Sequence, residues 1–182
     1  MMSPEPPTAP GSRVQADLRE ATVADAEAVE AVHYSAREAV YDGLVADWPP
    51  PGPDRPGRIA RWREWIGSPE VHTIVATVGG EIRGFVTVRA SKDDDARPGV
   101  AEMPTLYVDP AHWRQGLGDL LCRACTDWAA ANGFSELTLW VLEINAGARA
   151  FYRAFGFRED GGRKVDEGTR EKLVAYRYRI TL

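Results

Sequence analysis

The sequence predicts a single α/β domain built on a mixed β-sheet that carries helices on its faces. Two β-branched, alternating runs at residues 71–78 and 82–88 are joined by Gly79-Gly80, which accepts the positive φ angles of a tight hairpin turn. The rest of the chain then alternates strand-like and helix-like segments, so parallel and antiparallel neighbours must share one sheet. With 182 residues, 44% of them apolar, the chain can bury one core.

The N-terminal half contains proline-rich segments that interrupt the regular elements. Residues 1–13 hold four prolines and are expected to form a disordered tail, which leaves 14–182 as one domain. A strand at 14–21 is followed by a helix that Thr22 and Asp25 can cap. Five prolines between Trp48 and Gly57 predict a loop, either a packed surface connection or a pocket wall, and a short helix follows through 59–66.

The C-terminal half has the pattern of alternating strands and helices. Strands are expected at 100–108 and 137–142, helices at 116–131 and 146–155, and a final β region ends at 174–180. The acidic run at 93–95 precedes the first of these strands. Such a run is either solvated surface or a means of attracting a cationic substrate.

Composition excludes several functional classes. The 22 Lys and Arg against 27 Asp and Glu give a net charge of -5, so no broad basic surface for nucleic acid is expected. No apolar stretch is long enough to cross a membrane, and the first residues lack a signal peptide. Cys122 and Cys125 lie in a predicted helix without further zinc ligands, so we expect packing residues, no metal and a cytoplasmic location.

The segment from Leu106 to Leu121 carries the most chemical information. A strand ends at Asp109-Pro110 and a helix opens at Gly116, where free backbone N–H groups and the helix dipole favour an anion. Arg114 can add a fork of donors suited to phosphate. The dinucleotide fingerprint fails because Leu121 stands where glycine is needed, and the Gly-Lys-Ser/Thr of a P-loop is absent.

Three blocks of this sequence resemble the GNAT superfamily of acyl-coenzyme A-dependent N-acetyltransferases. The segment 113–118 (Trp-Arg-Gln-Gly-Leu-Gly) is similar to the family's pyrophosphate loop, Gln/Arg-x-x-Gly-x-Gly/Ala, with Trp113 in place of the first polar residue. The segments 102–110 and 145–157 resemble the family's fourth strand and the block after its fifth strand. The resemblance implies a central sheet of about six or seven strands flanked by about four helices.

The resemblance also implies a set of residues that bind acetyl-coenzyme A. Splayed fourth and fifth strands would expose backbone groups to the pantetheine, and Pro104 fits a bulge or break in pairing there. Asn145 would cap its helix, bind the pantetheine arm, or do both. The implied coenzyme-binding residues are Leu106, Tyr107, Val108, Arg114, Gln115, Gly116, Leu117, Gly118, Asp119, Asn145, Ala148 and Tyr152.

Two residues are candidates for the proton transfers. Tyr152 matches the family's tyrosine that protonates the leaving thiolate, although it could instead only pack with neighbouring phenylalanines. Glu102 is placed where many members hold a carboxylate that accepts the proton of the amine, and it shares alternation parity with Leu106 and Val108. The alternative for Glu102 is an exposed surface position near a strand start.

The expected function is transfer of an acetyl group from acetyl-coenzyme A to a primary amine of a small molecule or peptide, by direct attack in a ternary complex. A coenzyme-binding regulatory module without catalysis is the alternative. Acidic residues elsewhere would favour a cationic amine. The family also implies a possible homodimer, and the residues do not identify the acceptor.

Overall fold

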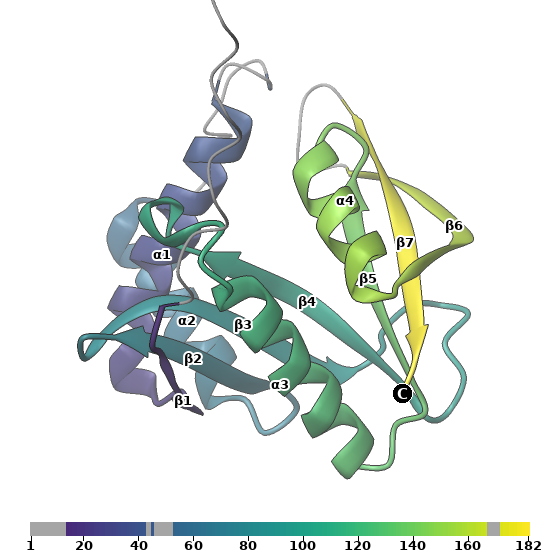
Figure 1. The fold of residues 1–182 in the computed structure, drawn as a ribbon, viewed down its shortest axis with the longest axis horizontal. Coiled ribbons are helices and arrows are strands. Elements are labelled where there is room, and N and C mark those ends of the chain that lie inside the picture. The colour runs from purple at the N-terminus through teal and green to yellow at the C-terminus, as the bar shows by residue number, and fades with distance from the viewer. Residues whose placement is uncertain (1–13, 43–44, 46–52, 167–171) are drawn as a thin grey trace, which may run out of the picture.

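The computed structural model describes residues 14–42, 45, 53–166 and 172–182. In this part of the chain seven strands form one sheet in the order β1-β2-β3-β4-β5-β7-β6 (Figure 1). The strands are β1 (Asp17–Glu20), β2 (His72–Val78), β3 (Glu81–Ala90), β4 (Val100–Val108), β5 (Glu136–Leu142), β6 (Arg158–Asp166) and β7 (Leu173–Thr181). The helices are α1 (Ala26–Tyr41), α2 (Arg55–Gly67), α3 (Leu117–Ala131) and α4 (Ala146–Phe155), with short 3₁₀ turns η1 (Val23–Asp25) and η2 (Pro110–His112).

The predicted mixed sheet is confirmed, because β4 and β5 form a parallel pair between two antiparallel groups. The hairpin at Gly79-Gly80 is confirmed as well, with φ angles of 60° and 85°. The expected tail at 1–13 and the position of Trp48 lie outside the described residues. Among the described residues, no helix is both long and apolar enough to cross a membrane.

Capping interactions set the beginnings of the 3₁₀ turn η1, which leads into α1, and of helix α2. The Asp25 carboxylate accepts the backbone N–H of Thr22 at 2.8 Å, as the capping pattern predicts. Arg19 donates to both oxygens of Asp25 at 2.7 and 2.8 Å and lowers its pKa to about 2. Helix α2 begins at Arg55, earlier than expected, because Asp54 accepts from Gly57 N and proline suits a first helical turn.

The parallel pairing between β4 and β5 is short. Three Cα pairs join the strands, from Val100 with Glu136 to Glu102 with Thr138. Beyond that point the strands diverge, and they form a V in the ribbon (Figure 1). The backbone of β4 after Glu102 is therefore paired with β3 on one side, and its other side faces the opening.

A bulge in β4 accompanies this divergence. In the register with β3, Thr105 lies opposite Thr87 but Glu102 lies opposite Arg89, so three steps along β4 match two along β3. The extra residue lies in the stretch that contains Pro104, as the proline predicted. The bulge reverses the alternation, so Glu102 faces the same side as Thr105 and not the side of Leu106; the parity expected from the sequence is wrong.

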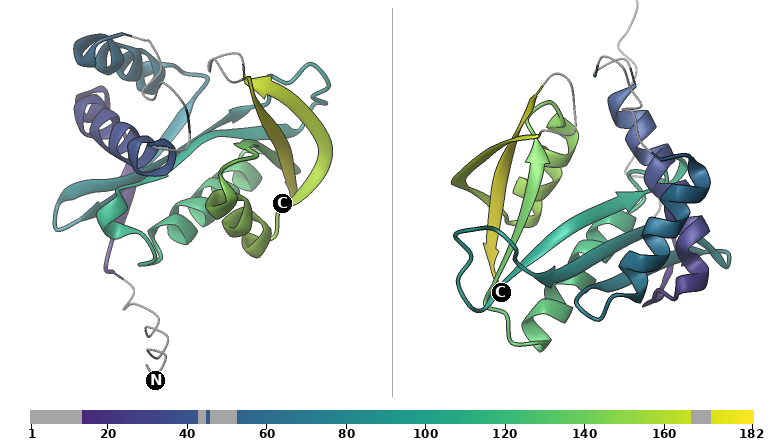
Figure 2. Two further views of the ribbon diagram at one scale, coloured as in Figure 1. Left: turned by 90° about the horizontal axis from the view of Figure 1, so that it is seen from above. Right: turned by 180° about the vertical axis from the view of Figure 1, so that it is seen from behind.

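Helices lie on both faces of the sheet (Figure 2), and each face carries its own cluster of buried side chains. Helices α3 and α4 cover one face and include both cysteines, which are free, buried and packed as expected. Helix α1 and Trp62 of α2 cover the other face against Val75 and Phe85. We refer to these as the α3–α4 face and the α1–α2 face.

Gly84 of β3 lies where a side chain of α3 packs tightly against the sheet. A Cβ at this position would lie 2.8 Å from Leu121 Cδ1 and 3.1 Å from the Tyr107 carbonyl oxygen. Gly84→Ala should therefore lower the free energy of unfolding by about 1–3 kcal/mol through overpacking, measured by urea denaturation. The control Gly67→Ala, at an exposed helix end, should change it by less than about 1 kcal/mol; equal effects would contradict the close approach.

Candidate active site

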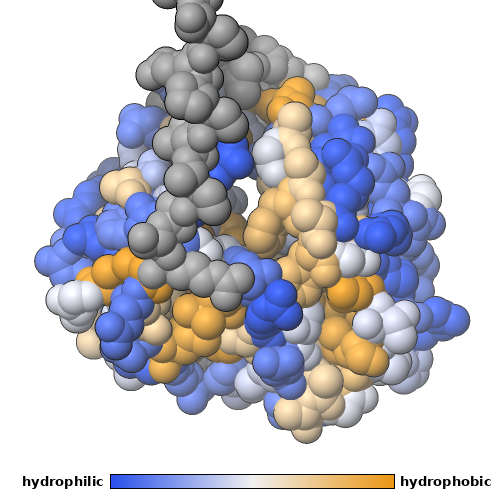
Figure 3. All heavy atoms as spheres, viewed as in Figure 1, coloured by the Kyte–Doolittle hydropathy of each residue, from blue (hydrophilic) through white to orange (hydrophobic). Residues whose placement is uncertain are grey.

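A cleft of about 560 Å³ occupies the opening between β4 and β5. The space-filling view shows the surface hollowed between the part that carries α1 and the part that carries α4 (Figure 3). Five predicted coenzyme-binding residues line it, namely Leu106, Tyr107, Asn145, Ala148 and Tyr152. Further lining residues that the sequence did not single out for this cleft include Arg37, Thr105, Trp140 and Lys164.

The chain between β4 and α3 forms a turn held by its own side chains. Asp109 accepts from Ala111 N at 3.1 Å and so begins the 3₁₀ turn η2. Gln115 Nε2 donates to the Ala111 carbonyl at 3.0 Å. Trp113 Nε1 donates to the Val108 carbonyl at 2.8 Å, so the residue that departs from the family's pattern ties the turn to the end of β4.

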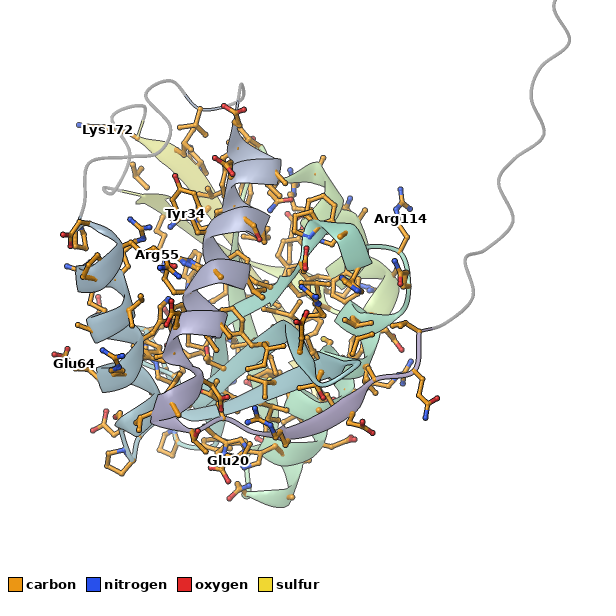
Figure 4. All side chains as sticks on the ribbon, turned by 90° about the vertical axis from the view of Figure 1, so that its left-hand side faces the viewer. Glu20, Tyr34, Arg55, Glu64, Arg114 and Lys172 are labelled. Carbon is orange, nitrogen blue, oxygen red and sulfur yellow. The ribbon has the colours of Figure 1, made fainter. Side chains whose placement is uncertain are left out.

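The first turn of α3 offers backbone donors to an anion. Gly116 is the N-cap with φ 90°, and no side chain caps the helix there. Arg114 has φ 63° and an exposed side chain, which points outward from the turn (Figure 4). Because N–H groups of a first helical turn lack helical acceptors, this terminus suits a phosphate group, with Arg114 close in sequence as a mobile donor.

The other predicted residues of this turn have individual roles. The Asp119 carboxylate is engaged by Arg123 Nε at 2.9 Å, one turn further along α3. Leu117 is buried in the core under the helix. Gly118 has room for a side chain, since a Cβ there would lie 3.5 Å from the Phe151 ring.

Helix α4 places two of the candidates on the cleft wall. Asn145 caps α4 by accepting from Ala148 N at 3.0 Å, and its Nδ2 donates to the Tyr41 hydroxyl at 3.5 Å. Tyr152 is buried and makes edge contacts with the rings of Phe151 and Phe157. Burial raises the pKa of Tyr152, so its phenol keeps its proton at neutral pH. Tyr152 therefore packs against neighbouring phenylalanines and also lines the cleft.

Glu102 lies at the closed end of the V, where β4 and β5 last pair. It is buried, not exposed, and its carboxylate forms an ion pair with Arg89. Lys92 N also donates to it at 3.4 Å. Glu102 is not among the residues that line the cleft, so any contact with substrate would have to pass through an intervening group.

The acidic run at 93–95 is tied to the sheet. Asp93 and Asp95 both accept from Arg177 of β7, and Asp93 also accepts from Trp140 Nε1 at 2.9 Å. Arg177 lowers the pKa of Asp95 to about 2. These two carboxylates thus organise the wall behind Trp140, a role that a run of three acidic residues does not indicate by itself.

Aromatic residues of α1 and α2 support the cleft from the α1–α2 face. His33 lies between the rings of Trp62 and Tyr107, with centroid distances of 5.3 and 4.7 Å. Burial lowers the pKa of His33 to about 3, so the imidazole is neutral. The ring contact with His33 holds Tyr107 at the cleft wall. Burial also raises the pKa of Tyr107 to about 12.

These features agree with the comparison with known families. The model of the Acetyltransferase (GNAT) family matches residues 37–157, more than half of the chain, and the chain belongs to this family. The resemblance seen in the sequence is confirmed. Among the described residues, no group of three or more His, Cys, Asp or Glu is arranged to hold a metal ion.

Several relatives and solved structures share parts of this chain. N-acetyltransferase family 8 member 3 of Mus musculus is 32% identical over 87 residues, 48% of this chain and 38% of that protein, so the chain spans well under half of that relative. N-alpha-acetyltransferase RimI of Mycobacterium tuberculosis is 32% identical over 111 residues, which cover 61% of this chain and 67% of that protein.

Solved structures show the same fold along nearly the whole chain. The PaiA N-acetyltransferase of Thermoplasma acidophilum in complex with coenzyme A superposes with a TM-score of 0.68 at 15% identity, over 93% of this chain and 100% of that one. The ribosomal-protein-alanine N-acetyltransferase of Brucella melitensis gives a TM-score of 0.71 at 23% identity, over 91% and 99%.

Proposed function

We propose that this protein transfers an acetyl group from acetyl-coenzyme A to a primary amine by direct attack in a ternary complex. The observation that carries the proposal is the V between β4 and β5, which opens a cleft lined by Tyr152. The chain that leaves β4 beside this opening goes on to begin α3, whose N-terminus has no side-chain cap. Relatives named as an N-alpha-acetyltransferase and as a mycothiol acetyltransferase support an amine acceptor.

The α3–α4 face would bind the acetyl donor. The pyrophosphate would accept hydrogen bonds from the N–H groups of the first turn after Gly116, while Arg114 adds charge from the solvent side. The pantetheine arm would enter between Leu106 and Asn145, where the side of β4 that faces the V offers backbone groups to its amides. A negatively charged protein can hold this polyanion because the site is built locally from backbone donors.

The chemistry follows from the order of bond changes. The amine nitrogen attacks the thioester carbonyl carbon, and an oxyanion forms that backbone N–H groups of β4 can stabilise. The carbon–sulfur bond then breaks, and the thiolate takes the phenolic proton of Tyr152, which burial keeps protonated. The ammonium proton leaves to water or, through water, to Glu102, and water then returns a proton to the Tyr152 phenolate, which restores the enzyme for the next turnover.

Turnover of a panel of primary amines tests the proposal. Free thiol should be released from acetyl-coenzyme A only when an amine is present. Gly118→Asp should weaken coenzyme binding at least about tenfold by repulsion of the pyrophosphate, whereas Gly67→Asp on α2 should not. Tight coenzyme binding without thiol release from any amine would instead favour a regulatory module that has lost catalysis.

Tyr152→Phe tests the general acid. Removing the phenolic proton should lower kcat by about ten- to a hundredfold and leave coenzyme affinity unchanged, because the ring still packs on Phe157. The control is Tyr176→Phe, whose hydroxyl donates to Glu143 at 3.1 Å outside the cleft lining. If both variants retain wild-type kcat, the tyrosine only packs.

Glu102→Gln tests the proton acceptor, and Arg89→Gln is its matched control because it breaks the same ion pair but keeps the carboxylate. A base should give about a tenfold or larger loss of turnover in Glu102→Gln alone, with coenzyme affinity intact. Both variants should lose stability. Equal turnover in the two variants across the pH range would show that Glu102 is only the partner of Arg89.

A further inference from the structure

The charged side chains that line the cleft have the opposite sign to the net charge of the protein. Among the described residues that line it, the side chains with a formal charge are Arg37 of α1 and Lys164 of β6, and both are positive. The ammonium of Lys164 lies 4.1 Å from the centroid of the Trp140 ring, a cation–π distance, so it is held against the cleft wall. The whole chain, in contrast, carries a net charge of -5.

The strand register places Lys164 on the α1–α2 face, which helix α1 with Arg37 covers. Lys164 lies opposite Ala175, which lies opposite Leu142, and side chains opposite one another share a face. Trp140 is two residues from Leu142 and therefore faces the same way, while Leu139 and Val141 point into the core under α3 and α4. The cations thus lie across the sheet from the turn that would bind the donor's pyrophosphate, at the side from which an acceptor would enter.

Carboxylates near this face are already paired with arginines. Asp93, Asp95 and Asp160 all accept from Arg177. Glu102 is paired with Arg89. None of these four acids lines the cleft, whereas Lys164 does. The attraction of a purely cationic amine, expected from the overall composition, therefore has no counterpart in the described lining.

We propose that the acceptor is an amine that also carries an anionic group, a carboxylate or a phosphate, which Lys164 binds at the cleft wall. The proposal rests on the proposed function and adds the class of its acceptor. An anion on the acceptor forms a charge-assisted hydrogen bond with the Lys164 ammonium. This contact fixes the amine relative to the thioester, which supplies the orientation that direct attack needs.

Matched acceptor pairs test the proposal: L-phenylalanine against phenethylamine, and O-phosphoethanolamine against ethanolamine. In the wild-type protein kcat/KM should favour an anionic member of a pair. Lys164→Met should lower kcat/KM for that member about tenfold and change the neutral member less than about twofold. Comparing each amine between proteins cancels its intrinsic reactivity.

Two further variants complete the design. Lys164→Arg keeps the charge and should retain the preference. Lys92→Met removes a cation that pairs with Glu70 outside the cleft lining, and it should behave as wild type. Preference for phenylalanine alone identifies the carboxylate, and preference for phosphoethanolamine alone identifies the phosphate. Equal kcat/KM within both pairs, or a preference that survives Lys164→Met, overturns the proposal.

Loss of the proposed function gives a different result. If no amine releases thiol, the acyl transfer itself is refuted, and the charge preference is then measured by calorimetry on the protein with coenzyme A. N-acetylphenylalanine and its uncharged amide are the probes. Tighter binding of the acid in wild type but not in Lys164→Met supports an anion site, whereas equal binding overturns it.

Discussion

The site depends on the loss of parallel pairing between β4 and β5 after three residue pairs. A sheet that continued to pair would satisfy its own backbone groups and leave no opening. The bulge near Pro104 and the short register at Glu102 interrupt the sheet at its centre, where strands are otherwise most protected. The cleft that Asn145 and Tyr152 line lies in this interruption.

Electrostatics in this protein are local. Arginines engage carboxylates near the cleft: Arg177 donates to three aspartates, and Arg89 forms an ion pair with Glu102. Different kinds of group would therefore bind the acetyl donor and the acceptor. In the proposed function, backbone donors after Gly116 would bind the polyanionic donor, and Lys164 on the opposite face would set the preference for the second substrate.

Sequence reasoning predicted the fold and the three segments that resemble the GNAT family, because these features depend on local signals. The signals are strand alternation, capping residues and a helix that begins at a glycine. Sequence reasoning missed the orientation of Glu102, since one extra residue in a strand changes parity without a change in hydrophobic pattern. Lys164 and Trp140 were also missed as a pair, because they meet only when β6 folds back beside β7 and β5. Contacts between distant strands leave no periodic signal in either segment.

The indole hydrogen bond of Trp113 also has a thermodynamic meaning. By joining the turn to the Val108 carbonyl, it fixes backbone that a ligand would otherwise have to order, together with the left-handed conformation of Arg114. If the turn binds the coenzyme as we propose, this conformational entropy is lost during folding instead of during coenzyme binding. An aromatic side chain would then order the proposed anion site before its ligand arrives.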